Sequence, residues 1–217
     1  MYIMKQLRLQ IITWNVGGSE TINNDQFTKL LSLDKANPVD VYVISLQEIE
    51  TGFLETAKSF VSYDDWAKLF MSTLSSLGFY LVENVRVQGL SLSVFAHLTH
   101  LAFVRFVRTH IVRTGLAGNW GNKGGVAISA RVYGEKICIL NTHLPAHLEY
   151  DEARVEQFCD IIEQMDFDNT LPILSHDVIF WSGDLNFRIN DFSRKEILDL
   201  IEKKSYTDLL QGDQVII

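Results

Sequence analysis

The sequence contains few of the residues that mark secreted, fibrous or multidomain chains. Of its 217 residues only two are cysteine and three are proline. Cys138 and Cys159 cannot build the disulfide framework of a small secreted domain, and they fit a reducing compartment. With so little proline and no low-complexity run, no linker divides the chain. We therefore expect one globular domain over residues 1–217 and a cytoplasmic location.

Long apolar runs are also missing. No stretch reaches the 18 or more apolar residues that mark a membrane-spanning helix. The nearest approach, residues 90–107, contains His97, His100 and Arg105, and it predicts a strand, a loop and another strand. The first ten residues lack the apolar segment of a signal peptide. Any membrane contact would therefore be transient or directed by a partner, at the cytosolic face of a membrane.

Positively charged residues are fewer than negatively charged ones. The chain has 19 Lys and Arg residues and 27 Asp and Glu residues, which gives a formal net charge of -8. This balance weighs against nonspecific nucleic-acid binding, which depends on Lys and Arg. It does not exclude a phosphorylated substrate, since Arg105, Arg108, Arg113 and Lys123 lie close in sequence. These arginines form either a local positive region or the outward side of an ordinary edge strand.

Apolar residues, in contrast, make up 47% of the chain and are enough for a substantial core. Apolar patterns predict strands at 7–14, 39–46, 126–132, 136–140 and 178–181, and helices at 25–33, 64–78, 149–165 and 193–201. Val155, Phe158 and Ile161 share one face of the third helix and predict a contact with the core. We expect the fourth helix to pack near the end of the strand at 178–181.

Polar residues follow four of these strands. Asn15, Glu48 and His143 each follow a strand, and Asp184 and Asn186 both follow the strand at 178–181. Any one of them is explained by turn chemistry. Four strand ends with this choice of residues instead predict a shared site beyond the edge of a sheet.

The chemistry of this set favours a hard divalent cation that acts on a phosphate. Glu48 is an oxygen ligand of the kind that Mg²⁺ takes. Asp184 is placed to orient or deprotonate a water, and Asn186, Asn15 and His143 to donate to phosphoryl oxygens. Zinc is disfavoured, because the cysteines are isolated and the histidines lack a compact ligand spacing. His147 taken alone is better explained as a polar loop residue.

Five glycines between residues 115 and 125 predict either an anion-binding loop beside Lys123 or a hairpin loop before the strand at 126–132. The segment is not a nucleotide-binding P-loop, because Gly124 follows Lys123 where that motif needs Ser or Thr.

Five segments together resemble the inositol polyphosphate 5-phosphatases of the endonuclease/exonuclease/phosphatase superfamily. They are Trp14-Asn15-Val16-Gly17, Leu46-Gln47-Glu48-Ile49, residues 121–128 (Gly-Asn-Lys-Gly-Gly-Val-Ala-Ile), Asn141-Thr142-His143-Leu144 with His147, and residues 181–188 (Trp-Ser-Gly-Asp-Leu-Asn-Phe-Arg). The resemblance implies an α/β fold, a DNase-I-like four-layer αββα sandwich with its metal site at one end of two packed sheets. It also implies Mg²⁺-dependent hydrolysis of the 5-phosphate of inositol polyphosphates or phosphoinositides by direct attack of water.

The resemblance further implies roles for individual residues. Glu48 matches the principal Mg²⁺ ligand and Asn15 a metal- and phosphate-site amide, while His143 contacts the scissile phosphate. Asp184 prepares the water and Asn186 helps to position it. The residues expected to bind substrate are Asn122 and Lys123, which meet the 1-phosphate away from the breaking bond, with His147 and Arg188; Phe53 and Leu54 occupy a weaker, lipid-contacting position.

One feature of the family is missing from the sequence. The family's later segment with basic residues for the 4-phosphate and a Ser-Asp-His motif has no counterpart after Asp208, and His176-Asp177 cannot replace it in order. We therefore expect a catalytic domain that is C-terminally incomplete and lacks its last strands. Two alternatives remain: a noncatalytic, truncated interaction module of the same fold, and a nuclease of the same superfamily, which the charge and the Gly-Asn-Lys-Gly-Gly segment disfavour.

Overall fold

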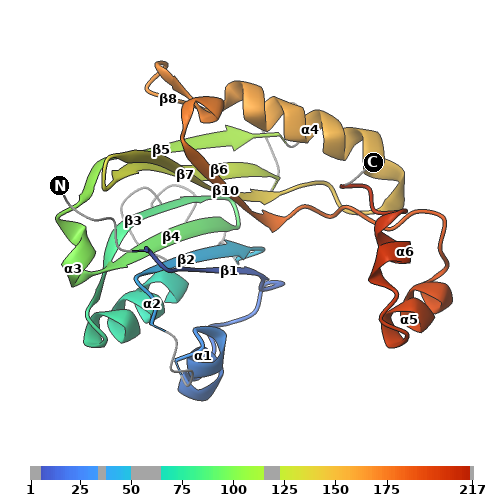
Figure 1. The fold of residues 1–217 in the computed structure, drawn as a ribbon, viewed down its shortest axis with the longest axis horizontal. Coiled ribbons are helices and arrows are strands. Elements are labelled where there is room, and N and C mark those ends of the chain that lie inside the picture. The colour runs from blue at the N-terminus through green and yellow to red at the C-terminus, as the bar shows by residue number, and fades with distance from the viewer. Residues whose placement is uncertain (1–5, 34–37, 50–64, 115–122, 216–217) are drawn as a thin grey trace.

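The computed structural model describes residues 6–33, 38–49, 65–114 and 123–215. Two four-stranded sheets lie face to face, and helices cover their outer faces (Figure 1). The predicted four-layer αββα sandwich is therefore confirmed. Among the described residues, none of the helices is both long and apolar enough to cross a bilayer.

The first sheet contains β1 and β2 as a parallel pair and β4 and β3 as antiparallel neighbours. Strand β2 is buried along its whole length, as expected for an inner strand that reads almost entirely apolar. The strands, in their order across the sheet, are β1 (Leu9–Asn15), β2 (Val41–Gln47), β4 (Leu90–His97) and β3 (Phe79–Val87).

The second sheet pairs β10 and β7 in parallel, with β6 and β5 antiparallel beyond them. In order across the sheet its strands are β10 (Val178–Asp184), β7 (Glu135–His143), β6 (Gly124–Val132) and β5 (Val104–Arg113). A small separate hairpin of β8 (Asp166–Phe167) and β9 (Leu171–Pro172) precedes β10.

Helices α1 and α2 cover the first sheet, and α4 covers the second (Figure 1). Capping boxes begin two helices: Asn23 with Gln26 begins α1, and Ser193 with Glu196 begins α5. The helices are α1 (Asn24–Leu30), α2 (Asp65–Ser76), α3 (Leu98–Leu101), α4 (Asp151–Gln164), α5 (Arg194–Glu202) and α6 (Tyr206–Leu210), with short 3₁₀ turns η2 (Leu148–Tyr150) and η3 (Ile173–Ser175).

Buried apolar residues form three clusters that hold these layers together. One fills the space between the sheets and includes Val43, Leu92 and Ile128. The second lies under α1 and α2 and includes Phe27 and Phe70, and the third lies under α4. At about 25 cal/mol per Å² of buried apolar surface, these clusters supply the main favourable free energy of folding.

The structure corrects several details predicted from the sequence. Helix α3 replaces the loop expected between β4 and β5, and β7 and β10 continue to His143 and Asp184 themselves. Val155 on α4 is 52% exposed and does not join the core. Helix α5 lies against α6 and away from both sheets (Figure 1), so the expectation that it packs near the catalytic strand is wrong. The predicted patterns were local, whereas these differences depend on contacts between distant elements.

Candidate active site

Polar side chains meet at one end of the sandwich because strands of both sheets end there. In the second sheet, Asp184 on β10 pairs in register with His143 on β7, and Gly124 at the start of β6 pairs with His143 from the other side. In the first sheet, Asn15 at the end of β1 pairs with Gln47 at the end of β2. The predicted convergence of strand ends is present in the structure.

The centre of this site is the side-chain amide of Asn15. Its Nδ2 donates to Glu48 Oε1 at 3.0 Å and to Asp184 Oδ2 at 3.1 Å. His143 Nε2 lies 3.7 Å from each of these two carboxylate oxygens. The structure thus brings together four of the predicted residues, two from each sheet.

The backbone at Glu48 directs its side chain into the site. Gln47 faces the second sheet, so a regular strand would turn the next side chain to the opposite face. Glu48 instead has a φ of 56°, a left-handed conformation that costs a non-glycine residue on the order of 1 kcal/mol. Its carbonyl accepts a hydrogen bond from Gly18 N at 2.8 Å, and Asn15 Oδ1 accepts one from Gly17 N at 3.0 Å. The bond from Gly18 to Glu48 joins the loops after β1 and β2, and the bond from Gly17 orients the Asn15 side chain.

Gly183, directly before Asp184, allows β10 and β7 to approach closely. Its φ is 129°, and a Cβ at this position would lie 2.1 Å from the carbonyl oxygen of Thr142. Only glycine fits this contact without a shift of the backbone. The glycine therefore sets the place of Asp184 opposite His143.

Asn186 supports Asp184 from the following turn. Its backbone N–H donates to Asp184 Oδ1 at 3.2 Å, and its Nδ2 donates to the carbonyl of Leu144 at 3.1 Å. Arg188 Nη2 in turn donates to Asn186 Oδ1 at 3.0 Å. Arg188 is thereby connected to the centre through Asn186.

Lys123 lies in the centre of the site. Its Nζ donates to His143 Nε2 at 2.5 Å. Burial is the main cause that lowers the pKa of both groups; the Lys123 charge lowers the pKa of His143 further, while Asp184 and Glu48 oppose the shift in each case. The lowered pKa favours a neutral imidazole that accepts this bond. His143 Nδ1 is buried and has no hydrogen-bond partner among the described residues.

The remaining predicted residues lie outside this centre or outside the described residues. His147 is exposed, has a φ of 74° and makes a ring contact with Tyr150. Its carbonyl accepts a hydrogen bond from Arg154 Nη1 at 2.6 Å, so its backbone is held while its ring stays at the surface. Asn122, Phe53 and Leu54 fall in segments that the structure does not describe.

A second polar layer, for which no role was predicted, lies directly beneath the centre. Gln47 Nε2 donates to Asn141 Oδ1 at 2.7 Å, and Ser45 Oγ lies 2.7 Å from Ser182 Oγ. Both contacts join the two sheets. The alternation of side chains along the strands could have indicated this layer. Asn141 lies two residues before His143, and Ser182 lies two residues before Asp184, so each shares the face of a centre residue.

The donor chemistry of the centre fits a hard divalent cation. In the parts of the chain that are described, no three or more His, Cys, Asp or Glu side chains are arranged to hold a metal ion. Mg²⁺, however, is usually held by one or two carboxylates, with water and substrate phosphate as its other ligands. The convergence of Glu48 and Asp184 on a single amide nitrogen shows that two such carboxylates already meet in one place.

Comparison with known proteins shows the family to which the chain belongs. Residues 12–216 match the model of endonuclease/exonuclease/phosphatase family 2. The chain is 39% identical to mouse inositol polyphosphate 5-phosphatase K over 214 residues, which are 97% of this chain and 45% of that protein. It is 39% identical to human phosphatidylinositol 4,5-bisphosphate 5-phosphatase A over 213 residues, which are 96% of this chain and 21% of that protein. The chain therefore spans less than half the length of either relative.

Solved structures share the fold. The inositol polyphosphate 5-phosphatase domain of a synaptojanin, in complex with inositol (1,4)-bisphosphate and calcium, matches with a TM-score of 0.81 and 23% identity, over 96% of this chain and 61% of that one. A Cimex nitrophorin matches with a TM-score of 0.71 and 20% identity, over 96% and 69% of the two chains. At these identities the likeness shows the fold alone. A nitrophorin shares this fold, so the function has to be inferred from the site residues.

Proposed function

Because the chain belongs to endonuclease/exonuclease/phosphatase family 2, we propose that it is built to hydrolyse the 5-phosphate of inositol polyphosphates or phosphoinositides. The observation that carries this proposal is the meeting of Asn15, Glu48, His143 and Asp184 within hydrogen-bond or near-contact distance at one end of the sandwich. Two named 5-phosphatases with 39% identity support the inositol phosphate as substrate class.

Glu48 and Asn15 are the residues that would hold a magnesium ion. Such an ion, when bound, draws charge from the phosphoryl oxygens. The acceptor Oδ1 of Asn15 is already used by Gly17 N, and its amide nitrogen faces both carboxylates. Asn15 Nδ2 orients both carboxylates, its Oδ1 keeps a second lone pair for the cation, and Glu48 supplies the negative charge.

Asp184 is the group that holds the attacking water. Its Oδ1 is fixed by the backbone N–H of Asn186, so Oδ2 remains directed at the centre. The water oxygen forms a bond to phosphorus as the bond from phosphorus to the inositol oxygen breaks, and inorganic phosphate and an inositol hydroxyl result. A carboxylate that accepts the water's hydrogen contributes about 10²–10⁴-fold in rate in enzymes of this kind.

Lys123 is placed to stabilise the phosphate, and His143 holds its ammonium in place. The Lys123 ammonium donates to His143 Nε2, and the same donor lies beside both carboxylates, so it is placed to contact phosphoryl oxygens at the reacting centre. A contact between Lys123, with Asn122, and the 1-phosphate stays a prediction. Arg188 and His147 are proposed as further substrate contacts, and Phe53 and Leu54 as a lipid contact.

A phosphoinositide substrate would place the protein at a membrane surface for part of its cycle. We propose cytoplasmic action at the cytosolic face of membranes, supported by the two cysteines without a disulfide among the described residues. The net charge of -8 weighs against nonspecific nucleic-acid binding and does not exclude a small phosphorylated substrate.

The test is Mg²⁺-dependent release of phosphate from inositol 1,4,5-trisphosphate by the 217-residue chain and, where the gene encodes residues after Ile217, by a version extended with them. Asp184→Asn is measured beside Asp25→Asn, whose carboxylate lies on α1 outside the site. We expect release that needs Mg²⁺, persists in Asp25→Asn and falls at least about 100-fold in Asp184→Asn.

Activity only in the extended version would locate the remaining catalytic groups outside residues 1–217. No release by either version, although both are folded, would refute the phosphatase proposal and favour an interaction module of the same fold. Cleavage of DNA in place of inositol trisphosphate would favour the nuclease.

A further inference from the structure

The side chains between the two sheets change from apolar to polar along the strands, toward the site. On β7 the side chains that face the first sheet are Ile137, Ile139, Asn141 and His143, in this order. On β2 the corresponding series is Val41, Val43, Ser45 and Gln47. Both series run from apolar through polar groups toward the site. The polar layer of Ser45, Gln47, Asn141 and Ser182 therefore separates the apolar core from the charged centre.

Asn141 links this polar layer to the first sheet. It is fully buried, and its Nδ2 donates to the carbonyls of Leu46 on β2 and Ser91 on β4, at 3.0 and 2.8 Å. Its Oδ1 accepts from Gln47 Nε2 at 2.7 Å. One side chain of the second sheet thus bonds to three groups of the first sheet.

Gln47 completes the connection from the other side. It is 1% exposed, and its Nε2 also lies within hydrogen-bond distance of Thr13 Oγ1 and of the carbonyl of Ser45, at 3.3 and 3.2 Å. Burial of an amide costs several kcal/mol unless it is hydrogen-bonded, so this pair is stable only in the arrangement that satisfies both groups. Other relative positions of the sheets would lose those bonds.

These two residues stand directly behind the reacting groups. Gln47 precedes Glu48 by one residue, and Asn141 precedes His143 by two. Apolar contacts between sheets are nondirectional and tolerate small sliding, whereas hydrogen bonds weaken steeply when distance or angle changes. In a catalytic site, misplacement by about 1 Å can cost about 100-fold in rate.

We propose that the Gln47–Asn141 hydrogen bond is a positioning device that sets the spacing between Glu48 on the first sheet and His143 on the second. Neither residue contacts the reacting atoms; both act through the neighbours that do. The predicted effect on rate rests on the proposed function. The effect on cation binding can be measured without any activity.

The experiment compares Gln47→Met, which keeps the side-chain length and removes the bond, with Asn141→Leu and with the pair. The matched control is the other side-chain hydrogen bond of this polar layer, Ser45–Ser182, which Ser45→Ala and Ser182→Ala remove; along β2, Ser45 lies two residues further from Glu48 than Gln47 does. Each variant is measured for its melting temperature, for its affinity for Ca²⁺ by calorimetric titration, and for kcat and KM with inositol 1,4,5-trisphosphate.

We expect Gln47→Met to weaken Ca²⁺ binding about 10–100-fold and to lower kcat more than it raises KM, because the ligands are displaced while the rest of the substrate site stays. The paired variant should lose little beyond the single ones, as coupled residues do. The serine controls should change the melting temperature with less than about a twofold change in Ca²⁺ affinity.

Equal Ca²⁺ affinity in folded Gln47→Met and wild type would overturn the proposal, as would equal losses in the serine controls. If Asn141→Leu does not fold, Gln47→Met decides, because it leaves both donors of Asn141 in place. A wild-type chain that binds Ca²⁺ and releases no phosphate would count against the proposed function and not against the positioning role.

Discussion

The carboxylate of Glu48 and the imidazole of His143 lie 3.7 Å apart, although each is carried by a different sheet. Glu48 reaches this place through a left-handed residue after β2, and His143 ends β7. The lowered pKa of His143, caused first by burial and then by Lys123, makes a strong ion pair with Glu48 unfavourable. The charge of Glu48 is therefore available to the cation that we propose it binds.

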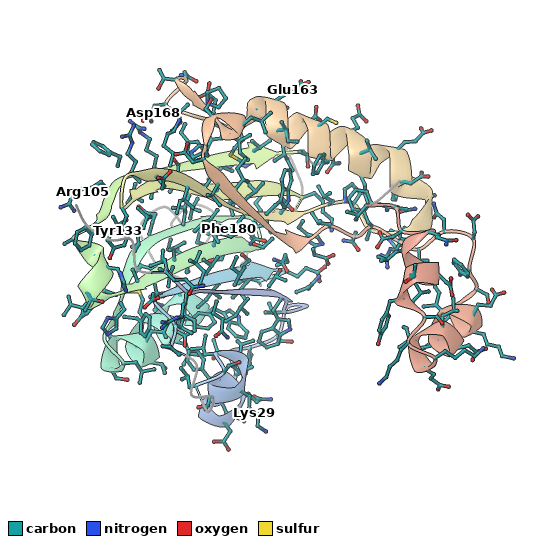
Figure 2. All side chains as sticks on the ribbon, viewed as in Figure 1. Lys29, Arg105, Tyr133, Glu163, Asp168 and Phe180 are labelled. Carbon is teal, nitrogen blue, oxygen red and sulfur yellow. The ribbon has the colours of Figure 1, made fainter. Side chains whose placement is uncertain are left out.

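Loss of this charge should weaken cation binding. We expect Glu48→Gln to reduce the affinity for Ca²⁺ or Mn²⁺ at least about tenfold, because the amide keeps the shape and removes the negative charge. The control is Glu163→Gln on the outer side of α4, where Figure 2 places this residue. Calorimetric titration measures both variants. Similar affinities in the two variants would contradict the assignment of Glu48 as a metal ligand.

Gly183 should tolerate no side chain. We expect Gly183→Ala to lower the free energy of unfolding by more than about 3 kcal/mol, because its Cβ would lie 2.1 Å from the Thr142 carbonyl oxygen. Gly134→Ala is the matched control, since Gly134 has a φ of 103° and no atom within 4 Å of the added Cβ; it should lose only about 1 kcal/mol. Urea denaturation that gives equal losses would show that the close approach of β10 and β7 is relaxed in solution.

The two cysteines should differ in reactivity. Cys159 is exposed, whereas Cys138 is buried, and burial raises the pKa of the Cys138 thiol from 9.0 to about 12. We expect one fast-reacting thiol in the native protein at pH 8, two in denaturant, and none that reacts fast in native Cys159→Ser, as measured with a chromogenic disulfide reagent. Two fast-reacting thiols in the native protein would show that α4 does not shield Cys138 on β7 from the reagent.

The same thiol predicts a pH dependence of stability. The folded state holds the Cys138 proton more tightly than the unfolded state does, so the contribution of this group is complete below pH 9 and is lost as the pH rises from 9 to about 12. Urea midpoints of wild type and Cys138→Ala should therefore converge over this range. Midpoints that stay parallel would contradict the shift.

Arg154 should stabilise the loop that follows the His143 strand. It is fully buried, and its guanidinium donates to the carbonyls of Pro145 and His147 and to Gln214 Oε1. We expect Arg154→Met to cost about 3 kcal/mol, because these acceptors lose a charged donor. Arg194→Met, at an exposed position in α5, is the control. Equal urea midpoints for the two variants would refute a structural role for Arg154.

Much of the fold follows from local patterns. The buried run at 39–46 predicted β2, and the polar residues after it predicted a site at the end of the strand. The helix predicted at 193–201 is likewise present as α5 (Arg194–Glu202), with Ser193 as its N-cap. The partners of α5 were predicted wrongly, because an amphipathic face shows that a helix is covered without showing by what.

The residue types that follow each strand, and those that share a face, can be predicted from the order of the amino acids, because strand geometry repeats every two residues. The contact of Lys123 with His143, and the bond of Gln47 to Asn141 across 94 residues of sequence, follow from the three-dimensional arrangement. Such pairs depend on how two sheets stack and slide on each other. That relation arises from packing and directional hydrogen bonds between distant segments, and no local pattern contains it.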